Sequence, residues 1–454
     1  MTILFDMNTE QLFKNFHNAI NWNAFLYVIQ KGLFCFSSFL LYKNLSVATF
    51  SLWANINCFI FLFLLWIDFG FRKSVPRYAP EFAQIKNGTK KFVRGLIFFQ
   101  LTVLAIATPL FFLLAHFFLK QVHISCPPSL LFFACGLFFV EGMVALVRLV
   151  FHSYFWNKQF NLLSSVVLLF QMICVVALIY TTDIDKKTVH ILFFIKIVAG
   201  VFILGASVYM LRFLYKDKTY CNKKKPALSL TKGVNKLPTK KFIQHSGVMW
   251  ATSFTKSLTE RNFLVPLFTV WFGPGPASLF KLANDAALFF QRVAIKTIGT
   301  TDTSLFAHLE ARGEGKKSLA VAFSKLATKL TALCIPLLGI SLFVFCSGYR
   351  LPGNTPLTST LFLTLVICYL LHVLLSAYER ILEVKRKYRM LFIIYLPYIA
   401  LLGSCFFLFH YGLVSSIGLL GCIGIIHGVR LVSVSIAAQI ARAQFGVRFR
   451  RRST

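Results

Sequence analysis

The stretch from Ser278 to Gly299 reads SLFKLANDAALFFQRVAIKTIG and places a row of charges on an otherwise apolar helix. At about 100° per residue, four charged residues fall within an arc of roughly 60°: Lys281, Asp285, Arg292 and Lys296. Such a row is costly on a helix that crosses a bilayer, so it must face protein or water there. The stretch therefore predicts a functional site, provided that the helix spans a membrane.

The composition favours a membrane protein. Of the 454 residues, 57% are hydrophobic, 52 are Phe and only 14% are charged. A soluble domain of this size carries about a quarter charged residues. The excess of apolar side chains must therefore face lipid, and we expect an all-α polytopic membrane protein.

Runs of about 20 mostly apolar residues predict twelve transmembrane helices. Their approximate extents are 22–42, 47–70, 93–119, 129–151, 162–181, 189–211, 245–271, 276–298, 319–346, 357–377, 390–409 and 412–437. The first, fourth, seventh and eighth of these spans carry internal charges and are the candidates for a functional role.

The loops between the spans alternate in charge. The segments 71–94 and 212–243 hold seven and ten Lys or Arg residues, whereas loops on the other side hold only one or two, such as Lys43 and Lys120. The positive-inside rule then places both termini in the cytoplasm. The net charge of +33 reflects mainly this bias and predicts contact with anionic membrane lipids. Because the basic residues are dispersed over many loops, we expect no nucleic-acid partner.

An internal repeat divides the chain into halves. In residues 71–118 and 298–345, a charged segment and a Lys-Lys pair precede an apolar span with one Pro, and Pro109 and Pro336 lie 227 residues apart. Duplicated six-span halves are common among transporters, which bind substrate between the halves. We predict an N-terminal lobe at 1–216, a basic cytoplasmic linker at 217–243, and a C-terminal lobe with a basic tail at 244–454.

Several segments resemble one known superfamily. Ile67 to Phe82, IDFGFRKSVPRYAPEF, is similar to the pattern that closes the second span in polysaccharide flippases of the multidrug/oligosaccharidyl-lipid/polysaccharide exporter superfamily, and Leu45 to Trp53 resembles that span's beginning. Glu260 to Leu264, followed by Phe272-Gly273-Pro274 and Leu279 to Ala283, resembles that family's seventh and eighth spans. Arg261 and Phe280 depart from the family pattern, in which an acid and a Tyr are commoner.

This resemblance implies two six-helix lobes around a central cavity, of the kind found in MATE transporters. It implies a flippase that carries a lipid-linked oligosaccharide across the bacterial inner membrane, with glycan polymerases or other envelope-assembly proteins as partners. A cation-coupled multidrug extruder of the same superfamily is the alternative.

The charges inside the spans bear on the substrate. The six basic candidates for substrate binding are Lys31, Arg148, Lys256, Arg261, Lys281 and Arg292, and the three acidic candidates for ion coupling are Glu141, Glu260 and Asp285. Helical spacing pairs Glu141 with Arg148, Lys256 with Glu260, and Lys281 with Asp285. The remaining positive excess favours an anionic group such as a diphosphate, because Arg and Lys can replace its lost hydration.

Other residues are expected to have no role at the site. Basic residues near span ends can extend to the membrane surface: Lys196, Lys296, Lys325, Lys329 and Arg430. Asn55 and Asn57 fit helix contacts as well as a binding role. No metal or cofactor motif occurs, and we expect no cofactor. A membrane glycosyltransferase or polymer ligase is disfavoured because the outer loops are short, so we do not expect an enzyme.

Overall fold

The computed structural model describes residues 9–83, 88–121, 124–153, 157–181, 186–216, 239–299, 316–346, 356–384, 388–410 and 414–445. Nearly all of these residues are helical, and none of them lies in a strand. In chain order the helices are α2 (Thr9–Asn44), α3 (Val47–Trp66), α4 (Phe71–Ala83), α5 (Gly88–Gln121), α6 (Pro128–Ser153), α7 (Asn157–Thr181), α8 (Lys186–Lys216), α10 (Thr239–Ser257), α11 (Arg261–Phe272), α12 (Pro274–Gly299), α14 (Lys316–Cys346), α15 (Pro356–Val384), α16 (Tyr388–His410) and α17 (Val414–Phe445).

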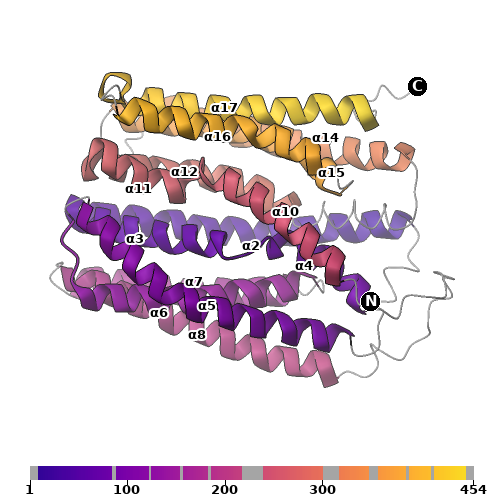
Figure 1. Ribbon diagram of the computed structural model, residues 1–454, viewed down its shortest axis with the longest axis horizontal. Helices are drawn as coiled ribbons and strands as arrows, with labels where there is room; N and C mark the ends of the chain where they lie inside the picture. The colour runs from indigo at the N-terminus through magenta and orange to yellow at the C-terminus, as the bar shows by residue number, and fades with distance from the viewer. Residues whose placement is uncertain are drawn as a thin grey trace.

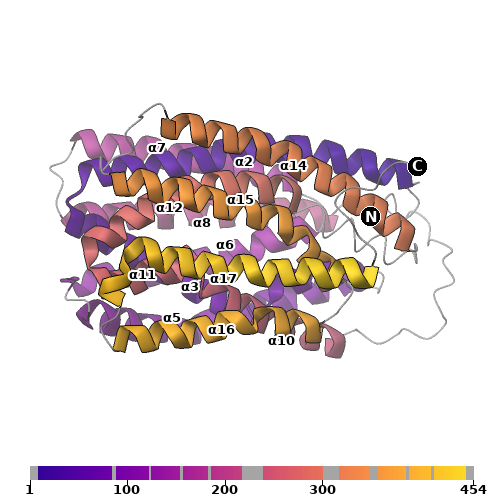
Figure 2. The same cartoon turned by 90° about the horizontal axis from the view of Figure 1, so that it is seen from above.

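The helices pack side by side in two groups that follow the two halves of the chain. In Figure 1, α5 to α8 lie on one side and α14 to α17 on the other. Contacts between the groups are made by α2, α3 and α4 with α10, α11 and α12. We call this contact region the seam. Helix α2 begins and α17 ends at the same end of the bundle (Figures 1 and 2).

The predicted all-α fold is confirmed. Each predicted span corresponds to one helix or, for the seventh, to a pair of helices. In the part of the chain that the structure describes, nine helices are long and apolar enough to cross a membrane. The remaining predicted spans correspond to α10 with α11, to α12 and to α16. Of the predicted linker at 217–243, residues 217–238 lie outside the described residues.

The prediction of one continuous helix over 245–271 is wrong. Helix α10 ends at Ser257 and α11 begins at Arg261, and the link between them is held by bonds such as Glu260 N–H to the Ser257 carbonyl, 3.0 Å. Side chains compete for the backbone here, because the hydroxyls of Ser257 and Thr259 donate to nearby carbonyls. Pro266, six residues into α11, also lacks the amide proton that a continuous helix would use.

The segment 71–94, which the sequence suggested to be a charged loop, contains helix α4. Its buried residues Phe71, Val75, Tyr78 and Phe82 recur at helical spacing, so one face of α4 is apolar. This face packs on α5, α6 and α10. Helix α4 therefore bridges the two halves at the end of the bundle where α2 begins (Figure 1).

The two prolines of the predicted repeat lie in corresponding helices. Pro109 is inside α5 and Pro336 is inside α14, each of which is the third long helix of its half and begins close to a Lys-Lys pair.

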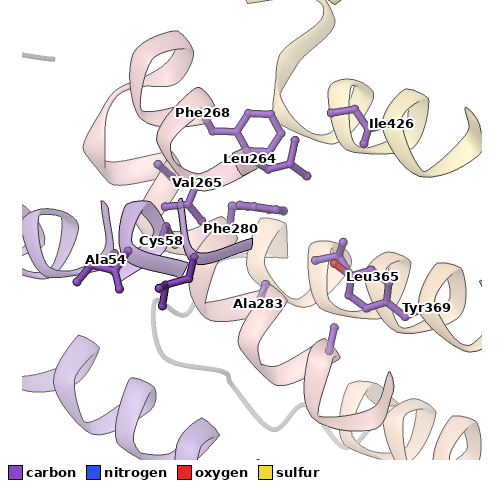
Figure 3. Packing of buried hydrophobic residues seen from close by; sticks show 14 of the residues in the cluster. Ala54, Cys58, Leu264, Val265, Phe268, Phe280, Ala283, Leu365, Tyr369 and Ile426 are labelled. Atoms are coloured by element: carbon purple, nitrogen blue, oxygen red, sulfur yellow. The ribbon is translucent and has the colours of Figure 1, made fainter. Parts of the chain in front are cut away.

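Small residues allow the helices of the seam to approach closely. Ala54 and Cys58 of α3 are almost completely buried, as are Ala283 and Ala287 of α12. Close helix packing through small side chains is a main source of stability in membrane bundles. Figure 3 shows α3, α11 and α12 meeting here, with α15 and α17 to their right. The labelled residues of this packing are Ala54, Cys58, Leu264, Val265, Phe268, Phe280, Ala283, Leu365, Tyr369 and Ile426.

Candidate functional site at the seam

The carboxylate of Asp285 on α12 is the centre of the candidate site. It accepts hydrogen bonds from Lys281 Nζ, 2.6 Å from Oδ2, and from Arg261 Nη1, which contacts Oδ1. The three side chains are at most 7% exposed. Two buried cations therefore share one buried carboxylate, which leaves one positive charge in excess.

The turn between α11 and α12 brings Arg261 beside Asp285. Gly273 links the two helices at φ +83°, a conformation that favours glycine, and Pro274 opens α12, where its missing amide proton costs nothing. Arg261 and Asp285 lie twelve residues before and after Gly273. In an antiparallel hairpin of helices, such positions are at the same level. The predicted Lys281–Asp285 pair is confirmed, and Arg261 joins it.

Asn262 orients the guanidinium of Arg261. Its Oδ1 accepts from Arg261 Nε at 3.3 Å and from Nη2 at 3.1 Å. The edge that carries Nη1 is thereby directed to Asp285. Arg261 thus has one partner on the next helix, Asp285, and one in the adjacent residue, Asn262.

Aromatic rings from the N-terminal half face both cations. Lys281 Nζ lies 4.3 Å from the centroid of the Trp53 ring and 5.2 Å from that of Phe50, and Arg261 Cζ lies 5.7 Å from that of Phe34. Cation–π contacts stabilise a cation by roughly 0.5–1 kcal/mol at an exposed site and by about 2 kcal/mol when the cation is desolvated. The site is thus built by both halves, and rings of the N-terminal half face the two cations of the C-terminal half.

Lys196 on α8 belongs to the same cluster, although the sequence predicted that it would extend to the membrane surface. Its Nζ donates to Asn57 Oδ1 at 2.7 Å and lies 5.4 Å from the Trp53 ring centroid. Trp53 therefore has an ammonium group from each half beside it. The prediction failed because α3 offers a polar partner, Asn57, inside the bundle. Asn55 makes a second such contact, accepting from Thr269 of α11 at 3.2 Å.

Lys256 pairs with a residue that sequence reasoning missed. Its Nζ donates to Glu379 Oε2 of α15 at 2.7 Å and lies 4.7 Å from the ring centroid of Tyr395. The predicted Lys256–Glu260 pair is wrong, because the helix that would align the two residues ends at Ser257. Glu379 was assigned to a loop beyond 377, but α15 continues to Val384 and buries it.

Arg430, also predicted to reach the surface, lies among buried side chains of the C-terminal half. Its Nη2 is 3.5 Å from His372 Nδ1, and its Cζ is 5.9 Å from the ring centroid of Tyr369. The Tyr369 hydroxyl donates to Asn284 Oδ1 at 3.2 Å, which connects this group to the residue next to Asp285. His427 packs edge-on against Tyr369.

The other predicted site residues are less closely involved. Arg148 is exposed, with its guanidinium 5.5 Å from the Phe160 ring centroid, and in the described part of the chain it forms no ion pair with Glu141. Glu141 on α6 and Lys31 on α2 are half-buried. Glu260 precedes α11 directly, and Arg292 lies two turns beyond Asp285 on α12. The side chains of Lys296 and Lys325 lie outside the described residues.

The seam is closed at the end of the bundle where α4 meets α10. Gly70, at φ +74°, lies so close to α10 that an added Cβ would be 2.2 Å from the Ser246 carbonyl oxygen and 2.7 Å from the Trp250 nitrogen. Ser74 Oγ is 2.8 Å from His245 Nδ1. Trp66 Nε1 donates to Ser257 Oγ at 3.0 Å. We call the contacts of Gly70 and Ser74 with α10 the α4–α10 latch.

Neither a search of protein-family models nor a search of curated proteins gives a match to the chain. Solved structures do match. A MATE transporter in complex with MaL6 has a TM-score of 0.65 and 13% identity, with 98% of each chain covered. An outward-facing multidrug resistance MATE transporter of the MOP superfamily has a TM-score of 0.65 and 12% identity, covering 98% of this chain and 97% of its own. A MOP superfamily transporter from Pyrococcus furiosus, whose binding pocket of reverse polarity suggests a different function, has a TM-score of 0.63 and 12% identity with the same coverage. The chain therefore has the MATE fold.

Proposed function

We propose that the protein is a membrane transporter that flips a polyprenyl-diphosphate-linked oligosaccharide from the inner to the outer leaflet by alternating access. The MATE fold supports transport as the general activity. The proposed location is a bacterial inner membrane, with both termini cytoplasmic. Proposed contacts are anionic lipids and envelope-assembly proteins such as a glycan polymerase.

The proposed substrate class follows from the balance of basic and acidic side chains inside the bundle. Seven basic side chains with buried or half-buried positions have been described: Lys31, Lys196, Lys256, Arg261, Lys281, Arg292 and Arg430. Four acids accompany them: Glu141, Glu260, Asp285 and Glu379. Among these eleven side chains the basic residues exceed the acidic ones by three. An interior of this polarity suits an anion.

A diphosphate is the anion that fits this proposal best. Its charge must be taken out of water, and Arg and Lys offer strong charge-assisted hydrogen bonds in return. Arg261, Lys281 and Lys196 lie together where both halves contribute side chains. Arg292 and Lys31, on neighbouring helices of the seam, are proposed to complete the binding site as the two halves separate.

Alternating access requires contacts that can open. The α4–α10 latch is the proposed cytoplasmic closure, because it joins the halves at the end where the positive-inside rule locates the cytoplasm. Glu141, Glu260 and Asp285 are the candidates for the ion-coupling acid.

A cation-coupled drug extruder is the second candidate, since the fold is shared with multidrug transporters. Cationic substrates would be repelled by the excess of positive charge in the seam. The archaeal transporter with a pocket of reverse polarity provides a precedent in this fold for a departure from the usual pocket.

Deletion of the gene and analysis of the accumulating lipids test the proposal. We expect a polyprenyl-diphosphate-linked glycan to accumulate, to be cleared by the wild-type chain, and not to be cleared by Lys31→Ala, Arg261→Ala or Arg292→Ala at equal membrane abundance. Full clearance by all three variants would contradict the cationic site. Loss of resistance to cationic dyes without accumulation of a lipid-linked glycan would favour the extruder.

A further inference from the structure

The geometry points to Asp285 as a resident anion that competes with the substrate's phosphate for Arg261 and Lys281. In this role, which rests on the proposed function, the carboxylate occupies the cations while no substrate is bound and must be displaced by the incoming head group. Asp285 is therefore assigned to substrate exchange, and ion coupling is left to Glu141 or Glu260.

The hydrogen bonds of Arg261 leave one nitrogen, Nη1, able to exchange one acceptor for another. Asn262 holds Nε and Nη2, so Nη1 is the group that contacts the carboxylate. Both Asp285 oxygens are in use, one by Arg261 and one by Lys281. A phosphate offers the same kind of acceptor with a third oxygen in addition. It could accept from Nη1 and from Lys281 while Asn262 keeps the guanidinium in its orientation.

The charges favour such an exchange. A carboxylate neutralises only one of the two cations, whereas a diphosphate carries enough negative charge to neutralise both. Among the described residues, Asp285 is the one acid in contact with either cation. Its departure would leave Arg261 and Lys281 buried without a counter-ion, which is strongly unfavourable unless another anion arrives. Binding of the substrate's phosphate and displacement of the Asp285 carboxylate are thus linked.

Arg261, Lys281 and Asp285, which we call the ion triad, lie where contacts would break and form again during transport. Arg261 is the first residue of α11, directly after the break that separates this helix from α10. Lys281 is held against Trp53 and Phe50 of the other half, so separation of the halves uncovers its ammonium group. The competing carboxylate would keep the empty site neutral enough to close again after the substrate has left.

The inference predicts an effect opposite to that of an ordinary binding residue. Loss of the Asp285 charge should strengthen anion binding, because the phosphate no longer has to displace a carboxylate, and it should slow release. We expect Asp285→Asn to bind farnesyl diphosphate about tenfold more tightly than the wild type, a change typical of a charge contact in a binding site.

Binding of farnesyl diphosphate to the purified full-length protein in nanodiscs tests this. The comparison includes Asp285→Asn, Asp285→Glu, Arg261→Ala and the control Asp68→Asn, whose acid lies beside Arg72 outside the ion triad. We expect tighter binding only for Asp285→Asn, unchanged affinity for Asp68→Asn, and no gain for Asp285→Glu, which keeps the charge. Inorganic pyrophosphate, as a second probe, shows whether the anion alone is recognised.

A charge-matched double variant covers the case in which Asp285→Asn does not fold. Lys281→Met/Asp285→Asn keeps one net positive charge, as in the wild type, and removes the competitor. Binding at least as tight as the wild type would support the inference. If both variants bind more weakly while Arg261→Ala abolishes binding, the resident-anion role is wrong and the proposed function stands. If the wild type does not bind either probe, the proposed function itself fails.

Discussion

Arg261 and Asp285 meet across the α11–α12 hairpin and form a buried ion pair, each twelve residues from Gly273. Lys281, one turn before Asp285, shares the carboxylate. Two interior cations, Arg261 and Lys281, thus depend on one carboxylate for a counter-ion. The free energy of this pairing can be measured.

Loss of Asp285 should destabilise the protein more strongly than loss of Arg261. Asp285→Ala leaves Arg261 and Lys281 buried without a counter-ion, which costs about 3–5 kcal/mol, whereas Arg261→Ala leaves the Lys281–Asp285 pair in place. The double variant Arg261→Ala/Asp285→Ala should be more stable than the sum of the two single effects predicts, because it leaves one unpaired cation, Lys281, instead of two. Reversible unfolding in detergent micelles measures these differences. Arg72→Ala, at an ion pair in which the arginine side chain is 51% exposed, is the control and should cost no more than about 1 kcal/mol. Additive effects of Arg261→Ala and Asp285→Ala would contradict the pairing.

Gly70 should tolerate alanine much less well than Gly273. Both have positive φ, so alanine is strained at either position, by on the order of 1–3 kcal/mol. Only at Gly70 would the added Cβ collide with backbone atoms of α10, whereas at Gly273 no atom lies within 4 Å. We expect Gly70→Ala to have the lower melting temperature and to impair transport more than Gly273→Ala. Equal effects would show that the close approach in the α4–α10 latch is unimportant.

Lys196 should matter for the affinity of an anionic head group, and Arg148 should not. Lys196→Met removes a cation that lies beside Trp53 at the site, whereas Arg148→Met removes one that is exposed on α6. We expect Lys196→Met to weaken farnesyl diphosphate binding by about tenfold, corresponding to about 1.4 kcal/mol. Titration of both variants in nanodiscs checks this. A larger loss in Arg148→Met would place the binding site elsewhere.

The Lys256–Glu379 pair should couple α10 to α15. Both groups are largely buried, so Lys256→Met and Glu379→Gln are each expected to destabilise the fold, with a coupling energy of about 1–3 kcal/mol in a double-mutant cycle. Thermal unfolding of the two single variants and the double variant gives this energy. A coupling close to zero would mean that the two side chains do not act as a pair.

Much of this fold could be predicted from the sequence. Apolar runs located the long helices, and Pro109 and Pro336 each lie inside one of them. The break at Leu258–Glu260 was hidden, because the surrounding residues are apolar enough to suggest one span. The signals that could have revealed it are the hydroxyl residues from Thr255 to Thr259 and Pro266.

The candidate site was predicted in part. The i, i+4 spacing identified Lys281 with Asp285, because a helix fixes that geometry locally. Arg261, Lys196 and Glu379 depend on contacts between helices, and spacing along one helix contains no information about those. Asn57 was a usable signal for Lys196, since a polar residue inside an apolar span requires a partner.

Reconstituted flipping tests the central claim most directly. Proteoliposomes containing the purified protein and a fluorescent short-chain polyprenyl-diphosphate sugar are assayed for movement of the lipid between leaflets. The proposal predicts transfer by the wild type, loss of transfer in Arg261→Ala, and normal transfer in Arg148→Met. Absence of transfer by the folded wild type, together with uptake of a cationic dye that an ion gradient drives, would contradict it.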